Sequence, residues 1–275
     1  MSPADVVAIN YGQDFGWSGS LLAEFCAPPE RSTVIVSHNF DRGPEIGRYE
    51  AVLTEEEFRR ALASLRRSRY DQLAESSEAV PPETCFLSAG ERRHGERLPT
   101  TRIYPVDALP AELAELRADF ETSVIPRVRS TPVRVLSATA TWQKPVFDPR
   151  EALAIDVSLL CQGPLPIVID NPLAPERRSS GLSLAIRNAA GRQTSVSLSA
   201  THLRAPPGSP GGDAATLVAS HSLAFSIRKA AYLIPGVYDG MLAYRSDAND
   251  SDPQAIQGEL WLPLKLVTIS SPRPP

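Results

Sequence analysis

The stretch Leu153–Asn171, which reads LAIDVSLLCQGPLPIVIDN, decides the fold of the second half of the chain. Its first part alternates branched apolar residues with small or polar ones, a period of two that places the apolar side chains on one face of a β-strand. The apolar positions are Leu153, Ile155, Val157 and Leu159. Gly163-Pro164 breaks the pattern, and Ile167 begins a second strand. Two strands cannot bury an apolar face alone, so this stretch predicts partner strands elsewhere in the chain.

Further segments of the same kind follow. The predicted strands are Val133–Trp142, Leu182–Arg187, Ser195–Ala200, Ser222–Ile227, Val237–Tyr244 and Glu259–Ile269. Turn residues separate them, including a long loop at Pro206–Gly212. Many short strands with regular turns predict an all-β sandwich of immunoglobulin-like type over residues 132–270, followed by a flexible tail at 271–275.

The first half mixes strands with helices. Thr54-Glu-Glu-Glu57 has the pattern of a capping box, and the apolar stripe after it predicts a helix over Glu55–Leu73. The opposite face of this helix is rich in arginine, which is typical of a solvated face. A second helix is predicted to begin at Leu109-Pro110. Residues 1–128 are therefore expected to form an α+β domain, an antiparallel sheet with two helices.

Several short motifs of this half resemble the emfourin-type small domain. They are Phe15-Gly16-Trp17-Ser18-Gly19, Leu53–Glu56, Thr84–Ser88 and Leu109–Leu113. The likeness covers roughly residues 5–125, and the family includes proteinaceous inhibitors of thermolysin-like metalloproteases. In the second half, Gly236-Val-Tyr238 resembles the start of a late strand in bacterial sandwich domains, which include binding modules and one class of intracellular proteinase inhibitor. These resemblances imply protein binding.

Composition and charge indicate which partners and which cellular compartment are expected. A net charge of −4 over 275 residues supplies no field that would attract nucleic acid or an anionic membrane. No apolar run approaches the ~20 residues of a membrane-spanning helix. The N-terminus lacks the pattern of a secretory signal, which predicts a cytoplasmic protein. The widely spaced Cys26, Cys85 and Cys161 are expected to be buried thiols.

Residues suited to chemistry are scattered. No histidine lies three or four residues from another histidine or a cysteine, so neither a metal nor a cofactor is predicted. The segment Asp247–Asp252 is similar to a calcium loop, but it lacks glycine at the sixth position and has Gly258 at the twelfth. It is expected to be a solvated hairpin loop, with a weak calcium site as the alternative.

These observations favour a non-enzymatic, bacterial-type protein-binding module, either a protease inhibitor or a regulatory or immunity protein. The predicted contact elements are the Gly12–Gly19 loop, the tip at Arg92–Arg97 and the Pro206–Gly212 loop. The candidate contact residues are Phe15, Trp17, Arg92, Arg93, His94 and Arg97. No catalytic residue is assigned.

Two other hypotheses stay open. The first is a hydrolase with a site between the domains, whose candidate members are His38, His94, Asp14 and Asp41. The second is a scaffold protein in which the exposed strand Glu259–Ile269 pairs with another chain. Pro263 cannot donate to a ladder, so this strand is expected at an edge or with a bulge.

Overall fold

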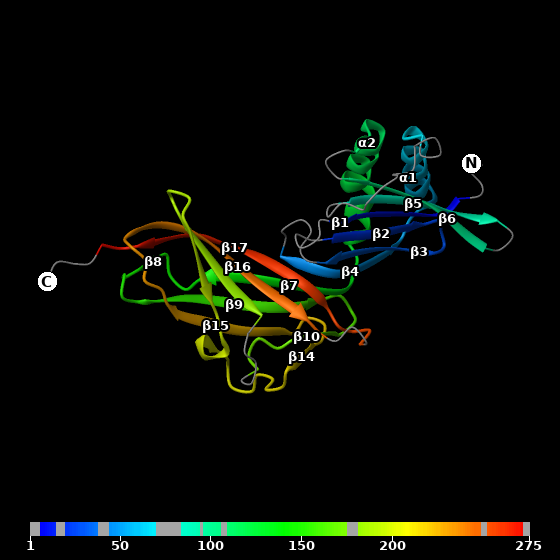
Figure 1. Cartoon of the computed structure of the whole chain (residues 1–275). Coiled ribbons are helices and arrows are strands. Elements are labelled where there is room, and N and C mark those ends of the chain that lie inside the picture. Colours follow the sequence, from blue (N-terminus) through cyan, green and yellow to red (C-terminus); the bar gives the residue numbers. More distant parts are fainter. Residues whose placement is uncertain are drawn as a thin grey trace. The chain divides into compact units, whose positions relative to one another are not determined.

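The computed structural model describes residues 6–14, 20–37, 44–69, 84–93, 96–105, 109–174, 181–248 and 252–271. The chain divides into two compact units (Figure 1). One comprises Met1–Phe40 and Gly47–Val133, and the other comprises Asp41–Ile46 and Arg134–Pro275. Within the described residues, no helix is of sufficient length and apolar character to cross a bilayer.

The first unit is built on one antiparallel sheet. Its strands are β1 (Val6–Asp14), β2 (Ser20–Cys26), β3 (Arg31–Ser37), β4 (Glu45–Val52), β5 (Thr84–Arg93) and β6 (Glu96–Pro105). Their order in the sheet is β4-β3-β2-β1-β5-β6, and each strand runs antiparallel to its neighbours in this series. Leu21, Ala23 and Phe25 alternate with less buried residues along β2, so one face of the sheet faces the core.

Helical segments cover this sheet face (Figure 1). They are α1 (Glu55–Arg67), α2 (Ala111–Asp119), a π-helical turn η4 (Phe120–Val124) and α3 (Ile125–Arg129). The predicted capping box of α1 is confirmed, because Thr54 Oγ1 accepts from the Glu57 amide at 3.2 Å and Glu57 Oε2 accepts from the Thr54 amide at 2.7 Å. The predicted end at Leu73 is wrong: the helix ends at Arg67, and Arg69 has a φ of 48°.

Phe120 anchors the helical layer on the sheet. Its ring is fully buried and meets Tyr11 and Phe25 edge-on, at centroid distances of 5.5 and 5.1 Å. Edge-to-face pairs of this kind add to the free energy gained from burial. The core of the first unit therefore lies between one sheet face and the helical run that begins at Ala111.

Strands dominate the second unit. They are β7 (Pro132–Trp142), β8 (Val146–Phe147), β9 (Ala152–Gln162), β10 (Ile167–Asp170), β11 (Leu182–Asn188), β12 (Gln193–Ser197), β13 (Leu203–Arg204), β14 (Ala214–Leu217), β15 (Ser222–Ala230), β16 (Gly236–Asp247) and β17 (Gln257–Ile269). A short 3₁₀ turn, η5, spans Ala200–His202. One set of neighbours runs β13-β15-β9-β7, a five-stranded sheet runs β12-β11-β16-β17-β8, and β10 pairs with β14.

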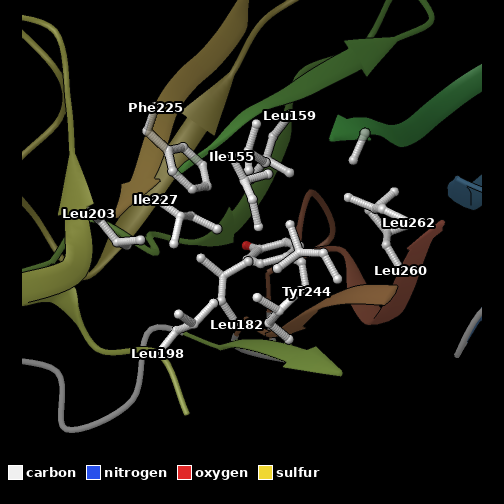
Figure 2. Packing of buried hydrophobic residues seen from close by; sticks show 14 of the residues in the cluster. Ile155, Leu159, Leu182, Leu198, Leu203, Phe225, Ile227, Tyr244, Leu260 and Leu262 are labelled. Atoms are coloured by element: carbon white, nitrogen blue, oxygen red, sulfur yellow. The ribbon is translucent and has the colours of Figure 1, made fainter. Parts of the chain in front are cut away.

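The core of the second unit lies between the strands β13-β15-β9-β7 and the five-stranded sheet. Ile155 and Leu159 of β9 point toward Tyr244 of β16, and Leu260 and Leu262 of β17 belong to the same cluster (Figure 2). The alternating residues that predicted the β9 strand are the buried ones, as expected. Along β15, as along most of β9, one face thus lies in the core and the other outside it.

The fold class predicted from the sequence is wrong. Strands make up 54% of the structure and helices 17%, so the protein is mostly β rather than an α+β domain with two helices followed by an immunoglobulin-like sandwich. The five-stranded sheet is mixed, since β8 is parallel to β17, and β10 and β14 pair apart from it. A period of two identifies a strand but not its partners, which depend on contacts between distant segments.

We expect Gly240→Ala in β16 to lower the free energy of unfolding by about 1–3 kcal/mol, the usual cost of overpacking. A β-carbon at this position would lie 2.9 Å from Cζ2 of Trp142 and 3.0 Å from Cδ1 of Leu264. Urea denaturation measures the change. The control is Gly211→Ala, whose β-carbon would have no neighbour within 4 Å. Equal destabilisation by the two substitutions would contradict this packing.

Candidate functional site

Most of the side chains predicted to make contacts lie outside the described residues. This holds for Phe15, Trp17 and His94, and for His38 and Asp41 of the hydrolase hypothesis. The backbone of the arginine-rich tip is described: β5 and β6 pair antiparallel, with Arg92 opposite Arg97. The side chains of Asp14, Arg92, Arg93 and Arg97 are not described. The arrangement of these side chains therefore lies outside what the structure describes, and both the contact role of the tip and the hydrolase site stay predictions.

Local structure accounts for several of the other residues considered in the sequence. Cys26 and Cys161 are buried, and burial raises the pKa of the Cys161 thiol. His202 Nδ1 lies 3.1 Å from the Ser199 amide nitrogen, so this histidine caps the turn η5. Among the described residues, no group of three or more histidine, cysteine or acidic side chains could hold a metal ion. In the segment predicted as a calcium loop, residues 249–251 lie outside the described part.

A groove of about 560 Å³ lies on the outer face of the five-stranded sheet. The alternation along β16 creates this face: Leu242 and Tyr244 point into the core, so Asp239, Met241 and Ala243 point outward. The same alternation along β11 and β17 turns other lining residues to this side. Sequence reasoning missed the groove, because it is formed by segments that are distant in the chain.

The strand register arranges the lining in rows. Ser183, Ala243 and Trp261 form one row across β11, β16 and β17. The next row contains Ala185, Met241 and Pro263. The face is hollowed because small side chains of β11 and β16 lie between larger ones. Cross-strand neighbours are within contact distance, so each row acts as one surface.

The hairpin between β11 and β12 supplies the far wall. Asn188 and Arg192 close the hairpin, and Ala189, Ala190 and Gly191 form its three-residue loop. The Gly191 amide donates to the Asn188 carbonyl at 2.9 Å, the Asn188 amide donates to the Arg192 carbonyl at 3.0 Å, and Gly191 has a φ of 77°. This geometry sets the register that places Gln193 opposite Arg187 and Ser195 opposite Ala185.

Arg187 and Asp239 form an ion pair at one end of the groove. Arg187 Nε lies 3.1 and 3.3 Å from the two carboxylate oxygens, and Nη2 lies 2.6 Å from Oδ2. Hydrogen bonding to Arg187 holds the pKa of Asp239 below its ordinary value, and the bond to Asp239 raises the pKa of Arg187. At another position along the groove, Glu259 stands opposite Arg245 in the register of β16 and β17. Each charge thus has an opposite charge as its neighbour.

A second feature of the same sheet is a group of exposed apolar residues, here called the apolar patch. It comprises Val146, Val237 and Leu266, together with Tyr232 and Ile234 in the segment that leads into β16. Val146 and Val237 both stand opposite Thr268, one from each side of β17. Leu266 is 67% exposed and Tyr232 is 100% exposed. Several large apolar side chains are thus exposed at this end of the sheet, and exposed apolar groups of this kind are typical of contact sites.

Leu266 departs from the regular series of β17. Leu260, Leu262, Leu264 and Leu266 alternate in the sequence, yet only the first three are buried. The pairing of β16 with β17 shifts register between Tyr238 and Gly240. Beyond this irregularity Val267 points into the core, so Leu266 points outward.

We expect the pKa of Asp239 to rise toward its ordinary value in Arg187→Met, because the hydrogen bonds from Arg187 that favour its charged form are lost. The stabilising effect of the pair is complete above the pKa of the unfolded chain and disappears as the pH falls through the lower, folded pKa. Carboxyl ¹³C NMR from about pH 2 to about pH 6, a range that surrounds the ordinary pKa of an aspartate, measures the titration. Arg187→Lys, the control, should restore part of the shift. An unaltered titration in Arg187→Met would contradict the pairing.

No family model and no curated protein matches this chain. Some solved structures resemble parts of it. A family 123 glycoside hydrolase from Clostridium perfringens shows 12% identity and a TM-score of 0.29, over 50% of this chain and 28% of that one. AvmM, which catalyses macrocyclization in alchivemycin A biosynthesis, shows 12% identity and a TM-score of 0.26, over 51% and 91%.

A Corynebacterium diphtheriae protein described as membrane anchored shows 10% identity and a TM-score of 0.25, over 93% of this chain and 59% of that one. The chain thus spans about a quarter of the glycoside hydrolase with which it was compared, and more of the other two proteins. At these TM-scores the likenesses carry no argument about fold or activity.

Proposed function

We propose that this chain is a non-enzymatic protein-binding protein and that the apolar patch is its contact surface. The observation that carries the proposal is the exposure of Leu266 and Tyr232, at 67% and 100%, together with that of Val146 and Val237. Fully burying a side chain such as leucine gains about 1.5–3 kcal/mol, so covering several of these residues is a substantial driving force. Tyrosine is also enriched among the residues that dominate binding energy at protein interfaces.

The surroundings of the apolar patch indicate the kind of partner. The exposed Lys265 directly precedes Leu266 in β17. Lys144, near Val146, pairs with Glu151 and lies over the ring of Phe147, 5.1 Å from its centroid. With Lys144 already paired, an apolar partner surface with an acidic group opposite the exposed Lys265 would complement this arrangement, since opposite charges guide association.

Protease inhibition is the specific form of binding that we propose. Its support is the resemblance of roughly residues 5–125 to emfourin-type domains. The apolar patch lies in the second unit, so the two lines of support concern different parts of the chain. An inhibitor that used both would present more than one contact region to its target, which favours tight binding.

Titration of the purified chain into thermolysin-like metalloproteases and serine proteases tests inhibition, with stoichiometric loss of activity as the expected result. In Leu266→Asp the affinity should fall at least tenfold, because an unpaired charge would be buried at the contact. The matched control is Leu165→Asp, at a leucine that is 39% exposed and lies outside the apolar patch. Unchanged proteolysis throughout the panel would contradict inhibition.

A photo-crosslinking amino acid at position 232 tests the wider proposal of protein binding. It should join the chain to one defined partner in cells, and Leu266→Asp should abolish that product. The same amino acid at position 165 serves as the control. A product that is insensitive to Leu266→Asp, or no product from position 232, would exclude the apolar patch as the contact surface.

A further inference from the structure

The groove has an apolar side and a polar side. Trp261, Met241 and Pro263 provide the apolar side from β16 and β17. Arg187, Asp239 and Gln193 gather at the polar end, close to the β11–β12 hairpin. A ligand that fills such a groove must itself combine an apolar face with a hydrogen-bonding edge, because each wall is complementary to only one of these.

The charges in the groove disfavour an ionic ligand. Arg187 is held by Asp239 through bonds to both carboxylate oxygens. Glu259 faces Arg245, whose guanidinium also bonds Asp247 at 2.9 Å. A phosphate or carboxylate ligand would have to break an existing pair or lie beside a carboxylate, and either costs free energy. The balanced charge favours a neutral ligand.

The polar groups suit adjacent hydroxyl groups. A guanidinium carries five N–H donors, and the bonds to Asp239 use those on Nε and Nη2 only. The Asp239 carboxylate retains acceptor capacity, and the Gln193 amide is both donor and acceptor. Planar groups of this kind bind two neighbouring hydroxyls at once, with the directionality of charge-assisted hydrogen bonds. Ser183 and Ser195 add single hydroxyls along the floor.

The dimensions agree with a small polyhydroxylated molecule. At about 560 Å³ the groove falls within the range of roughly 300–1,000 Å³ for small-molecule sites. Ala185 and Ala243 keep the floor low, so a ring can lie close to the sheet. The groove crosses several strands on an open face, which leaves its ends accessible to a chain longer than one ring.

From these contacts we infer that the groove binds a neutral carbohydrate. The apolar face of one pyranose ring packs on the Trp261 side, and the hydroxyl groups of another ring of the same oligosaccharide bond the Arg187–Asp239 pair and Gln193 at the other end of the groove. This site is separate in residues and in ligand class from the apolar patch, so the inference goes beyond the proposed protein contact.

Binding of the full chain to cellohexaose, maltohexaose and chitohexaose, measured by calorimetry and by ¹⁵N NMR, tests the inference. At least one of these neutral oligosaccharides should bind, with shifts confined to β11, β12, β16 and β17. Trp261→Ala should weaken binding at least tenfold. Ser183→Leu, at an exposed position, fills the floor without removing a wall and should weaken binding equally while the protein stays folded.

Matched controls separate this site from the protein contact. Val146→Asp, in the part of the apolar patch that lies on β8, should weaken photo-crosslinking from position 232 and leave oligosaccharide affinity unchanged. Ser183→Leu should leave photo-crosslinking from position 232 unchanged. No binding of any of the three oligosaccharides at millimolar concentration would overturn the inference. Binding of heparin or polygalacturonate in their place, or binding that Ser183→Leu and Trp261→Ala both leave intact, would also overturn it.

Discussion

The burial of one side of the long strands β9, β15, β16 and β17 is the constraint on which the rest of the second unit depends. Side chains of β9 and β15 meet those of β11, β16 and β17 in one core, with Tyr244 fully buried within it. The hydroxyl of Tyr244 donates to the Asp170 carbonyl, so even the polar atom of this ring is satisfied. Once the inward residues are chosen, the period of two assigns every residue between them to the outer face. The candidate surfaces are therefore consequences of the core.

A single irregularity changes what the outer face presents. If β16 and β17 paired without a shift, the leucine series of β17 would continue into the core. The shift between Tyr238 and Gly240 gives Val267 the inward position, and Leu266 is turned outward beside Val237. A β-bulge costs some regular pairing, and such features recur where a strand must redirect a side chain. Here the bulge leaves Leu266, a residue of the kind usually buried in a core, exposed on the surface.

The five-stranded sheet carries two surfaces of different character. The apolar patch lies toward β8, where large aliphatic groups are exposed. The groove lies toward β12, where small residues leave space and ionic groups are already paired. Apolar surface favours a protein partner, whereas an amphipathic hollow of balanced charge favours a small neutral ligand. One sheet face thus supports both proposals without a shared residue.

The sequence by itself determined the local elements, because their signals lie within a few residues of one another. Alternation predicted β9, and the Thr54–Glu57 capping box predicted the start of α1. The tertiary structure alone decided the fold class, the exposure of Leu266 and the groove. Ser183, Asp239 and Trp261 are far apart in the chain, and only the pairing of β11, β16 and β17 brings them together. Strand pairing is a long-range choice, which a periodic pattern does not encode.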